Sequence, residues 1–176
     1  MALTKLNFSG SGLSSLPNGS VIQTVSANKL DTTGSADFDA NFENISGLSV
    51  NITPSSTSSK IYVIATLQVS ISSYHITFRI ARDGNAIITP VAAGNRMLGM
   101  AHIYGSSSFN DHYNIESKVM QVLDTTHNST SQLTYTVQGQ NKNNPNTTGL
   151  AINGTNNGDD GAYNSRTTST ITAMEI

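Results

Sequence analysis

The sequence predicts an all-β protein, an antiparallel jelly-roll-like β-sandwich with an extended N-terminal arm. Three observations favour this fold class. First, Ser, Thr and Asn contribute 24, 21 and 19 of the 176 residues, and their short side chains compete for backbone hydrogen bonds, which makes them mediocre helix formers. Second, apolar and polar residues alternate with a period of two in several segments. Third, clusters of Gly, Asn, Ser and Pro separate these segments and are typical of turns.

The longest alternating segment is residues 61–71, IYVIATLQVSI. Its odd-numbered positions are all apolar and its even-numbered positions are polar or amphipathic, with Ile64 as the exception. The alternation resumes at residues 74–81, YHITFRIA, so we expect a second strand there. Asp83 and Gly84 follow, and both tolerate the positive φ angles of a tight hairpin turn, with residues 86–88 as the returning strand.

The other expected strands have less uniform patterns. Residues 96–104 are apolar on both faces, which indicates a strand buried on two sides or one interrupted by a bulge at Gly99. Residues 113–124 fit both a strand and a helical stripe, and the flanking Asn, Ser and Thr residues favour a strand. Shorter segments are expected as strands at residues 20–27, 47–54 and 132–140, and residues 149–152 are a short apolar piece within turn and loop segments. A series of eight or nine short strands joined by turns suits a jelly roll.

The chain closes on an apolar segment, SRTTSTITAMEI at residues 165–176. Chain ends are usually frayed and polar, so this segment needs a partner. In Greek-key sandwiches the last strand often lies inside a sheet, which anchors it on both sides. The sequence therefore predicts a strand whose two faces meet the core and a neighbouring subunit, formed by Ile171, Ala173, Met174 and Ile176.

Two regions are expected along the chain. Residues 1–20 are Gly-rich and polar and predict an extended attachment arm, and residues 21–176 predict the β-sandwich domain. A plain linker would not need the spaced apolar side chains that the arm contains. These candidate anchors are Leu3, Leu6, Phe8, Leu13 and Leu16.

Composition and motifs exclude several function classes. The chain has no cysteine, and its formal net charge of −2 gives no basic field for nucleic acid. No apolar run is long enough for membrane insertion, and synthesis in a cytoplasm is expected. The four histidines lack metal-ligand spacing, and no nucleophile elbow or phosphate-binding loop is present. The segment NNGDDG at residues 156–161 offers oxygen donors but lacks the EF-hand pattern. We therefore expect a protein that is not an enzyme and has no cofactor or metal.

Three segments resemble a family of small β domains encoded by tailed bacteriophages, especially marine and cyanobacterial ones. They are LPNGSVIQTVSA at residues 16–27, GLSVNITPSSTSSKIYV at residues 47–63 and GAYNSRTTSTITAMEI at residues 161–176. Members of that family occur as tail-fibre or other virion structural proteins. The resemblance implies a homotrimeric jelly-roll-like module on the surface of a virus particle, made in the bacterial host, and it supplies no catalytic residue.

Several non-enzymatic roles agree with this resemblance. The module is expected to act as a capsid decoration or cement protein, or as a short fibre, with its arm held by the major capsid protein or by a tail or fibre base. The alternative is a receptor-binding fibre tip that recognises host surface glycans through its loops. A secreted lectin-like or TNF-like module is a third reading. Candidate glycan contacts are Tyr104, Tyr113, Asn141, Asn144 and Tyr163.

Overall fold

The structure is a computed structural model, and it describes residues 19–105, 113–142, 147–155, 161–162 and 164–176. Eleven strands account for the regular structure in these residues. They are β1 (Gln23–Lys29), β2 (Thr33–Phe38), β3 (Glu43–Ile52), β4 (Ile61–Ile71), β5 (Tyr74–Arg82), β6 (Asn85–Ala86), β7 (Ala101–Gly105), β8 (Glu116–Asp124), β9 (Leu133–Gln140), β10 (Thr147–Ile152) and β11 (Ser169–Glu175).

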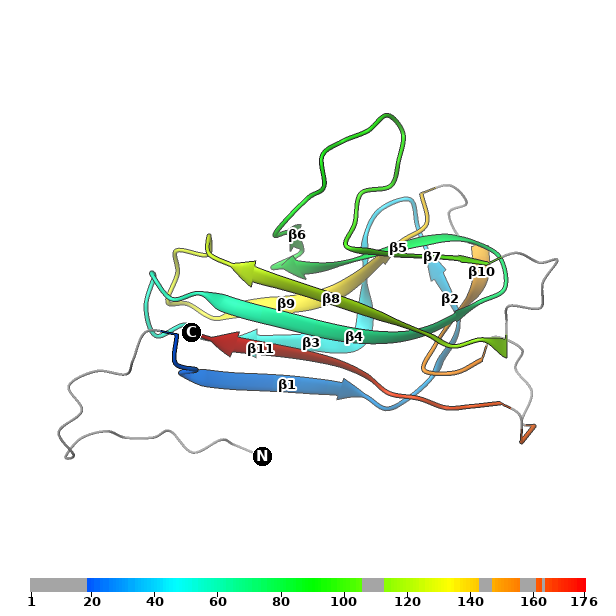
Figure 1. The fold of residues 1–176 in the computed structure, drawn as a ribbon, viewed down its shortest axis with the longest axis horizontal. Helices are drawn as coiled ribbons and strands as arrows, with labels where there is room; N and C mark the ends of the chain where they lie inside the picture. Colours follow the sequence, from blue (N-terminus) through cyan, green and yellow to red (C-terminus); the bar gives the residue numbers. More distant parts are fainter. Residues whose placement is uncertain (1–18, 106–112, 143–146, 156–160, 163) are drawn as a thin grey trace.

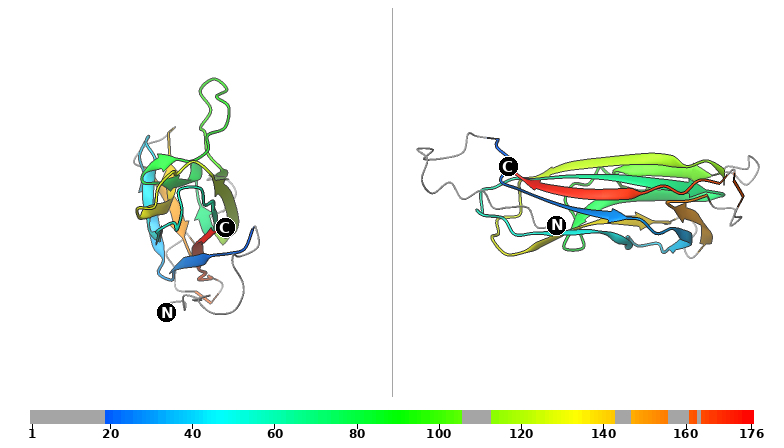
Figure 2. Two further views of the ribbon diagram at one scale, coloured as in Figure 1. Left: turned by 90° about the vertical axis from the view of Figure 1, so that its left-hand side faces the viewer. Right: turned by 90° about the horizontal axis from the view of Figure 1, so that it is seen from below.

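The strands form two antiparallel sheets that pack face to face (Figures 1 and 2). Sheet A has the order β1-β11-β4-β10-β2, with β8 paired to the other side of β4. Sheet B has the order β3-β9-β5-β6, with β7 also paired to β5. Between β2 and β10 the chain changes sheet repeatedly, as a jelly-roll-like sandwich requires. The predicted fold class is therefore confirmed.

The core lies between the sheets and is built by the alternation seen in the sequence. The odd-numbered residues of β4, from Ile61 to Ile71, are buried, and its even-numbered residues up to Gln68 are half-buried on the outer face. On β5 the even-numbered Ile76, Phe78 and Ile80 point inward. Phe78 meets Phe38 of β2 edge to face, with ring centroids 6.4 Å apart. Burial of these apolar side chains supplies the main driving force for the fold.

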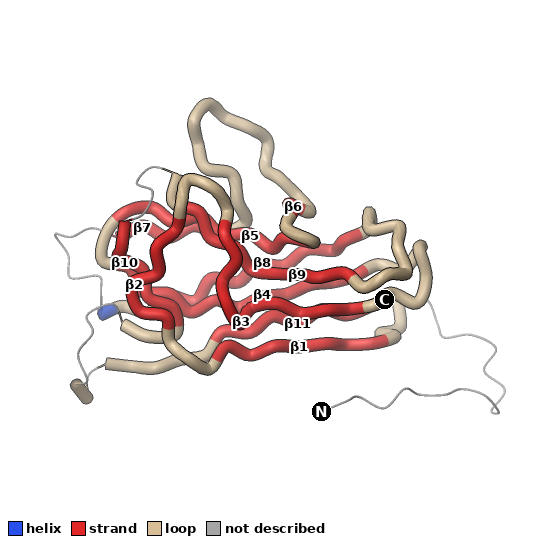
Figure 3. The backbone as a smooth tube through the Cα atoms, turned by 180° about the vertical axis from the view of Figure 1, so that it is seen from behind, coloured by secondary structure: helices blue, strands red, loops and turns tan. Residues whose placement is uncertain are grey.

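The last strand lies inside sheet A, as the sequence predicts. β11 pairs with β1 on one side and with β4 on the other (Figure 3). The ladder continues to the final residue, because Ile176 and Lys60 exchange backbone hydrogen bonds of 2.9 and 3.1 Å. Ladder hydrogen bonds on both sides explain why the chain can end on an apolar segment.

The hairpin turn after β5 is also confirmed, although its second strand is short. Asp83 and Gly84 have φ angles of 49° and 81°, the positive values that a tight two-residue turn demands. The returning strand β6 spans only Asn85–Ala86, whereas residues 86–88 were expected. The chain then leaves the sheet in a long loop, residues 87–100, which projects from the sandwich in Figures 1 and 3.

Three elements differ from the sequence-based expectation. Residues 96–100 belong to the projecting loop, so their apolar side chains mark a loop packed on the sheet and not a strand buried on both sides. Residues 116–124 form strand β8, which settles the choice between helix and strand in that segment. β2 was not expected, because residues 33–38, TGSADF, have little apolar alternation and are held by pairing with β10.

Candidate interaction surface

The outer face of sheet A carries a set of apolar side chains that the core does not use. β4 and β8 pair in register, with Tyr62 opposite Leu123, and β4 and β11 pair with Tyr62 opposite Met174. Leu123, Tyr62 and Met174 therefore form a row across three neighbouring strands. Ile64 lies two residues after Tyr62 on the same face of β4. The one apolar residue that interrupts the polar alternation of this strand therefore extends the apolar row. We call Tyr62, Ile64, Val119, Leu123 and Met174 the sheet A face.

Exposure on this face is concentrated on β8. Val119 and Leu123 are 59% and 44% exposed, and in the described part of the chain β8 pairs only with β4. It is therefore an edge strand with free hydrogen-bonding groups along one side. Tyr62 is fixed on the face by its hydroxyl, which donates to Gln121 Oε1 at 2.6 Å. An edge strand with exposed apolar side chains is a typical site of association with another chain.

The projecting loop extends this surface beyond the sheet. A hollow of about 390 Å³ lies between the base of the loop and β8. On the loop, Val91 is 93% exposed and Ile88 is 51% exposed. The hollow is lined by Ile88, Thr89, Pro90, Gly99, Met100, Val119, Met120 and Gln121. The apolar surface thus continues from the sheet A face onto the loop.

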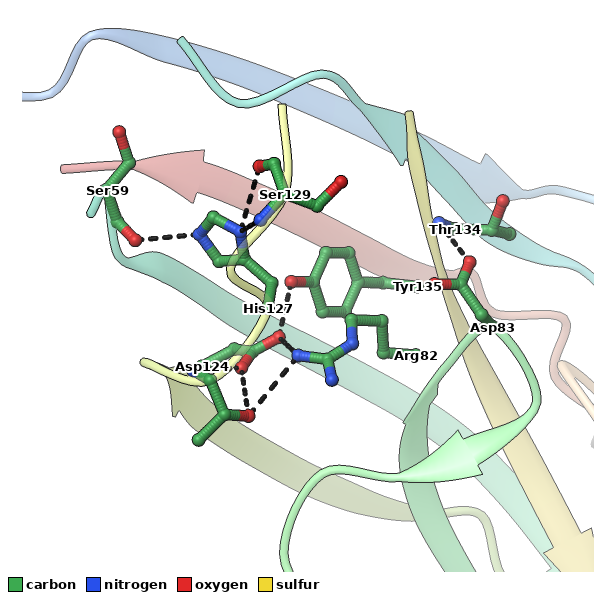
Figure 4. A network of polar contacts seen from close by, with 9 residues as sticks. Ser59, Arg82, Asp83, Asp124, His127, Ser129, Thr134 and Tyr135 are labelled. Carbon is green, nitrogen blue, oxygen red and sulfur yellow. Dashed lines mark hydrogen bonds and ion pairs between the residues drawn. The ribbon is translucent and has the colours of Figure 1, made fainter. Parts of the chain in front are cut away.

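A buried polar network fixes the end of β8 against sheet B (Figure 4). Asp124 Oδ2 accepts a hydrogen bond from Arg82 Nη1 at 2.5 Å and one from the Tyr135 hydroxyl at 2.7 Å. Asp124 Oδ1 accepts from the N–H and the hydroxyl of Thr126, both at 3.0 Å. Burial raises the pKa of Asp124, but these hydrogen bonds outweigh it and hold the pKa below its ordinary value. Burial, aided by the charge of Asp124, raises the pKa of Tyr135.

His127 holds the loop that follows β8. Its imidazole is buried, with Nε2 at 2.7 Å from the carbonyl oxygen of Ser59 and Nδ1 at 3.1 Å from the backbone of Ser129 (Figure 4). These contacts tie the loop after β8 to the segment before β4. The ring therefore has a structural explanation that does not involve a ligand.

His75, His102 and Tyr104 form a stacked aromatic group on the outer face of sheet B. The rings of His75 and Tyr104 are 4.5 Å apart, and those of His75 and His102 are 5.5 Å apart. Burial of the His102 ring lowers its pKa, and the neighbouring His75 and Lys118 lower it further. No local pattern of residues predicts this group, because pairing of β5 with β7 brings the three residues together.

The residues predicted for the last strand occupy its two faces. Ile171 and Ala173 are fully buried in the core, whereas Met174 and Ile176 are half-buried on the opposite side. Met174 belongs to the sheet A face. The polar residue between them, Glu175, is fully buried, and the sequence analysis missed it.

The predicted glycan-contact residues do not gather into one place in the described structure. Tyr104 on β7 is 56% exposed and Tyr113 before β8 is 44% exposed. Asn141 is fully buried, and its backbone N–H donates to the Asp39 carbonyl at 3.0 Å. The candidate residues outside the described part of the chain are Asn144, Tyr163, Leu3, Leu6, Phe8, Leu13 and Leu16.

No group of three or more His, Cys, Asp or Glu side chains among the described residues is arranged to hold a metal ion. Within the same residues, no helix has the length and apolar character needed to cross a membrane.

Comparison with known proteins gives distant structural similarity only. No protein-family model and no curated protein matches the sequence. The Gx strain structure of infectious bursal disease virus matches 87% of this chain at 16% identity, with a TM-score of 0.39. A crystal structure of a VP2 subviral particle of infectious bursal disease virus matches 88% at 12% identity, with a TM-score of 0.37. This chain spans 37% and 41% of those two chains. We base no functional conclusion on a likeness at this level.

Proposed function

We propose that this protein is a non-enzymatic structural module of a bacteriophage particle, which associates into a homotrimer through the sheet A face. The observation that carries the proposal is the register-aligned row of Leu123, Tyr62 and Met174, continued by Val119 on an edge strand. The resemblance of residues 16–27, 47–63 and 161–176 to phage β domains supports the virion setting. In this proposal the trimer sits on the particle surface as a decoration protein or short fibre.

Physical chemistry favours association at this face over simple exposure. Ser, Thr and Asn make up 64 of the 176 residues, and only 11% of residues are charged, so uncharged side chains supply much of the polar character of the chain. Apolar side chains grouped on such a surface gain about 25 cal/mol for each Å² that a partner removes from water. Closed rotational symmetry is the usual outcome when identical chains associate, and the expected trimer has a threefold axis.

The first experiment replaces Val119 and Leu123 together by Ser and measures mass by sedimentation velocity. The wild-type chain should sediment as a trimer and the double variant as a folded monomer. The matched control is the double replacement of Val21 and Leu30 by Ser, because these side chains are 54% and 73% exposed and lie outside the face. A wild-type monomer, or a trimer that survives in the β8 variant, would contradict the proposed interface.

Attachment and location on the particle need a second experiment. Immunogold electron microscopy with antibody against this protein should label the parent particle, evenly over the head for a decoration protein. Deletion of residues 1–16 should leave a folded trimer that no longer enters particles, if the arm is the attachment element. If the antibody labels no part of the particle, the proposal that this protein is a virion component is wrong.

One observation favours glycan recognition as the second candidate function. Tyr104 is exposed and stacks on His75, so the pair presents an aromatic surface of the kind on which sugar rings pack. If the module is a fibre tip, label should be confined to the tail. Replacement of Tyr104 by Ala should then reduce adsorption to host cells and leave the trimer intact.

A further inference from the structure

A second hollow lies on the other flank of the projecting loop, against the outer face of sheet B. Its volume is about 450 Å³, and it opens between the loop, the segment before β3 and the end of β9. Ile88, Thr89 and Gly99 line both this hollow and the one beside β8, so the loop separates the two. The charged, amide and aromatic side chains that line it belong to Asn41, Phe42, Arg79, Arg96, Gln140 and Lys142.

Among the described residues, the charges that line this hollow are all of one sign. Arg79, Arg96 and Lys142 line it, and no described Asp or Glu does. Eight of the nine Lys and Arg residues lie in the described part of the chain, and three of those eight form ion pairs there. Five cations therefore have no carboxylate partner in that part, and three of the five meet in one hollow. In a chain with so few charges, this concentration indicates a site for an anion.

Contacts with neighbouring residues fix the Arg79 guanidinium and leave some of its N–H donors available for an anion. Its guanidinium lies 3.9 Å from the centroid of the Phe42 ring, and its Nε–H donates to Gln138 Oε1 at 2.7 Å. Its Nη2 reaches the Gly84 carbonyl at 3.4 Å, and the remaining N–H groups have no partner among the described residues. Burial of the guanidinium lowers its pKa, and no nearby carboxylate offsets this. A guanidinium fixed on two sides, with donors left over, is arranged for bidentate binding of an oxyanion.

The two acids nearest along the chain, Asp39 and Glu43, are not part of the lining. Asp39 Oδ1 accepts the backbone N–H of Ala40 at 2.5 Å, and Glu43 Oε2 accepts the backbone N–H of Asp39 at 3.3 Å. Lys142 and Arg96 are both exposed, so their ammonium and guanidinium groups are free to move onto a ligand.

The other walls suit the body of a sugar. Phe42, Met97 and Leu98 offer apolar surface for the C–H face of a pyranose ring, and Asn41 and Gln140 bring amide groups that hydrogen-bond to hydroxyls. From this combination we propose that the hollow binds an acidic saccharide, a sugar unit bearing a carboxylate or sulfate group. The anion contacts Arg79, Arg96 and Lys142, and the ring lies against the apolar wall.

The cations of this site lie on sheet B, the loop and the segment after β9, and none of them belongs to the sheet A face, although Ile88, Thr89 and Gly99 of the loop line both hollows. The site is also distinct from the Tyr104 group, whose residues do not line the hollow. A failure of the saccharide experiment would leave the structural proposal standing, and failure of the trimer would not affect this site.

Isothermal titration with defined sugars tests the proposal on the full chain. The probes are digalacturonate, galactose 6-sulfate, neutral galactobiose and inorganic sulfate. At least one of the two acidic sugars should bind about tenfold more tightly than both neutral galactobiose and inorganic sulfate, since galactobiose makes no charge-assisted hydrogen bond and inorganic sulfate makes no contact with the apolar wall. Absence of binding by both acidic sugars, or equal binding of inorganic sulfate, would overturn the proposal.

A matched pair of double variants locates the binding. R96Q/K142Q removes two cations from the hollow, and K60Q/R166Q removes two cations that have no carboxylate partner in the described part of the chain and lie outside the lining. The first pair should weaken binding of the acidic sugar by about tenfold or more, and the second by less than about twofold. Equal losses in the two variants would show that net charge alone attracts the ligand and would overturn the site.

Discussion

Arg82 Nη1 lies 2.5 Å from Asp124 Oδ2, and this ion pair joins β5 of sheet B to β8 of sheet A. The Tyr135 hydroxyl of β9 donates to the same carboxylate oxygen. Among the described strands β8 has a partner on one side only, so side-chain bonds to the opposite sheet help to hold it in place. The position of Val119 and Leu123 on the sheet A face depends on this anchor.

Replacing Arg82 by Met should destabilise the fold by about 2 kcal/mol, because Asp124 stays buried and loses its ionic partner. Arg82 is only partly exposed, and its aliphatic part is preserved in Met, so lost packing contributes little. Urea denaturation measures the change. Arg166→Met is the control, since Arg166 forms no ion pair in the described structure. If both variants lose the same stability, the Asp124 network is not what holds β8.

Glu175 should make the protein sensitive to acid. Burial raises the pKa of Glu175, but hydrogen bonds from Ser55, Ser59 and Gln23 outweigh it and hold the pKa below its ordinary value of 4.5. A carboxylate with a lowered folded-state pKa stabilises the protein fully above pH 4.5, and this stability is lost as the pH falls below that value.

The variant E175Q tests this expectation. Its amide keeps only one acceptor oxygen, so its N–H₂ group must face donors of either Gln23 or Ser55, and the variant should lose about 2 kcal/mol at neutral pH. The difference from wild type should shrink when urea unfolding is repeated below pH 4.5, because the unfolded wild-type chain then takes up a proton that the folded carboxylate binds less readily. The control E116Q changes an exposed carboxylate. A difference that stays constant with pH would refute the role of the Glu175 charge.

Gly139 should not tolerate a larger side chain. A Cβ atom built there would lie 2.5 Å from Cζ of Phe38 and 2.7 Å from its Cε1, which is closer than carbon atoms approach. The Phe38 ring is buried against Phe78 and has little room to move. We expect Gly139→Ala to cost about 2 kcal/mol, as overpacked cores do. Gly34→Ala, where nothing lies within 4 Å of the added carbon, should change the melting temperature much less.

The sequence was most informative where one local pattern decides the structure. The alternation of residues 61–71 predicted β4 with its correct bounds, and the Asp83-Gly84 pair predicted the turn. Residues 87–100 were harder, because an apolar loop packed on a sheet and a buried strand have the same composition. Only the tertiary structure separates them.

The sites could not have been predicted in the same way. Phe42, Arg79, Arg96 and Lys142 are spread over 100 residues, and the hollow exists because sheet pairing and the loop bring them together. Glu175 and Ser55 are 120 residues apart, so a buried carboxylate satisfied by serines leaves no local signal. One sign was present, since Ile64 interrupts the polar face of its strand. On its own this exception does not predict the sheet A face, because the apolar residues beside it come from β8 and β11.

The two faces of β11 should respond differently to the same substitution. Ile171 is fully buried between the sheets, so Ile171→Asp places a charge in the core and should abolish folding, seen as loss of the β-sheet circular dichroism spectrum. Met174 lies on the sheet A face beside Tyr62, so Met174→Asp should give a folded monomer in sedimentation velocity. Asn51→Asp, at an exposed position of β3 on the outer face of sheet B, adds the same charge away from the sheet A face, serves as the control and should remain a trimer. An unchanged trimer in Met174→Asp would mean that this face does not meet a second copy, and the association would have to be sought at another surface of the described structure.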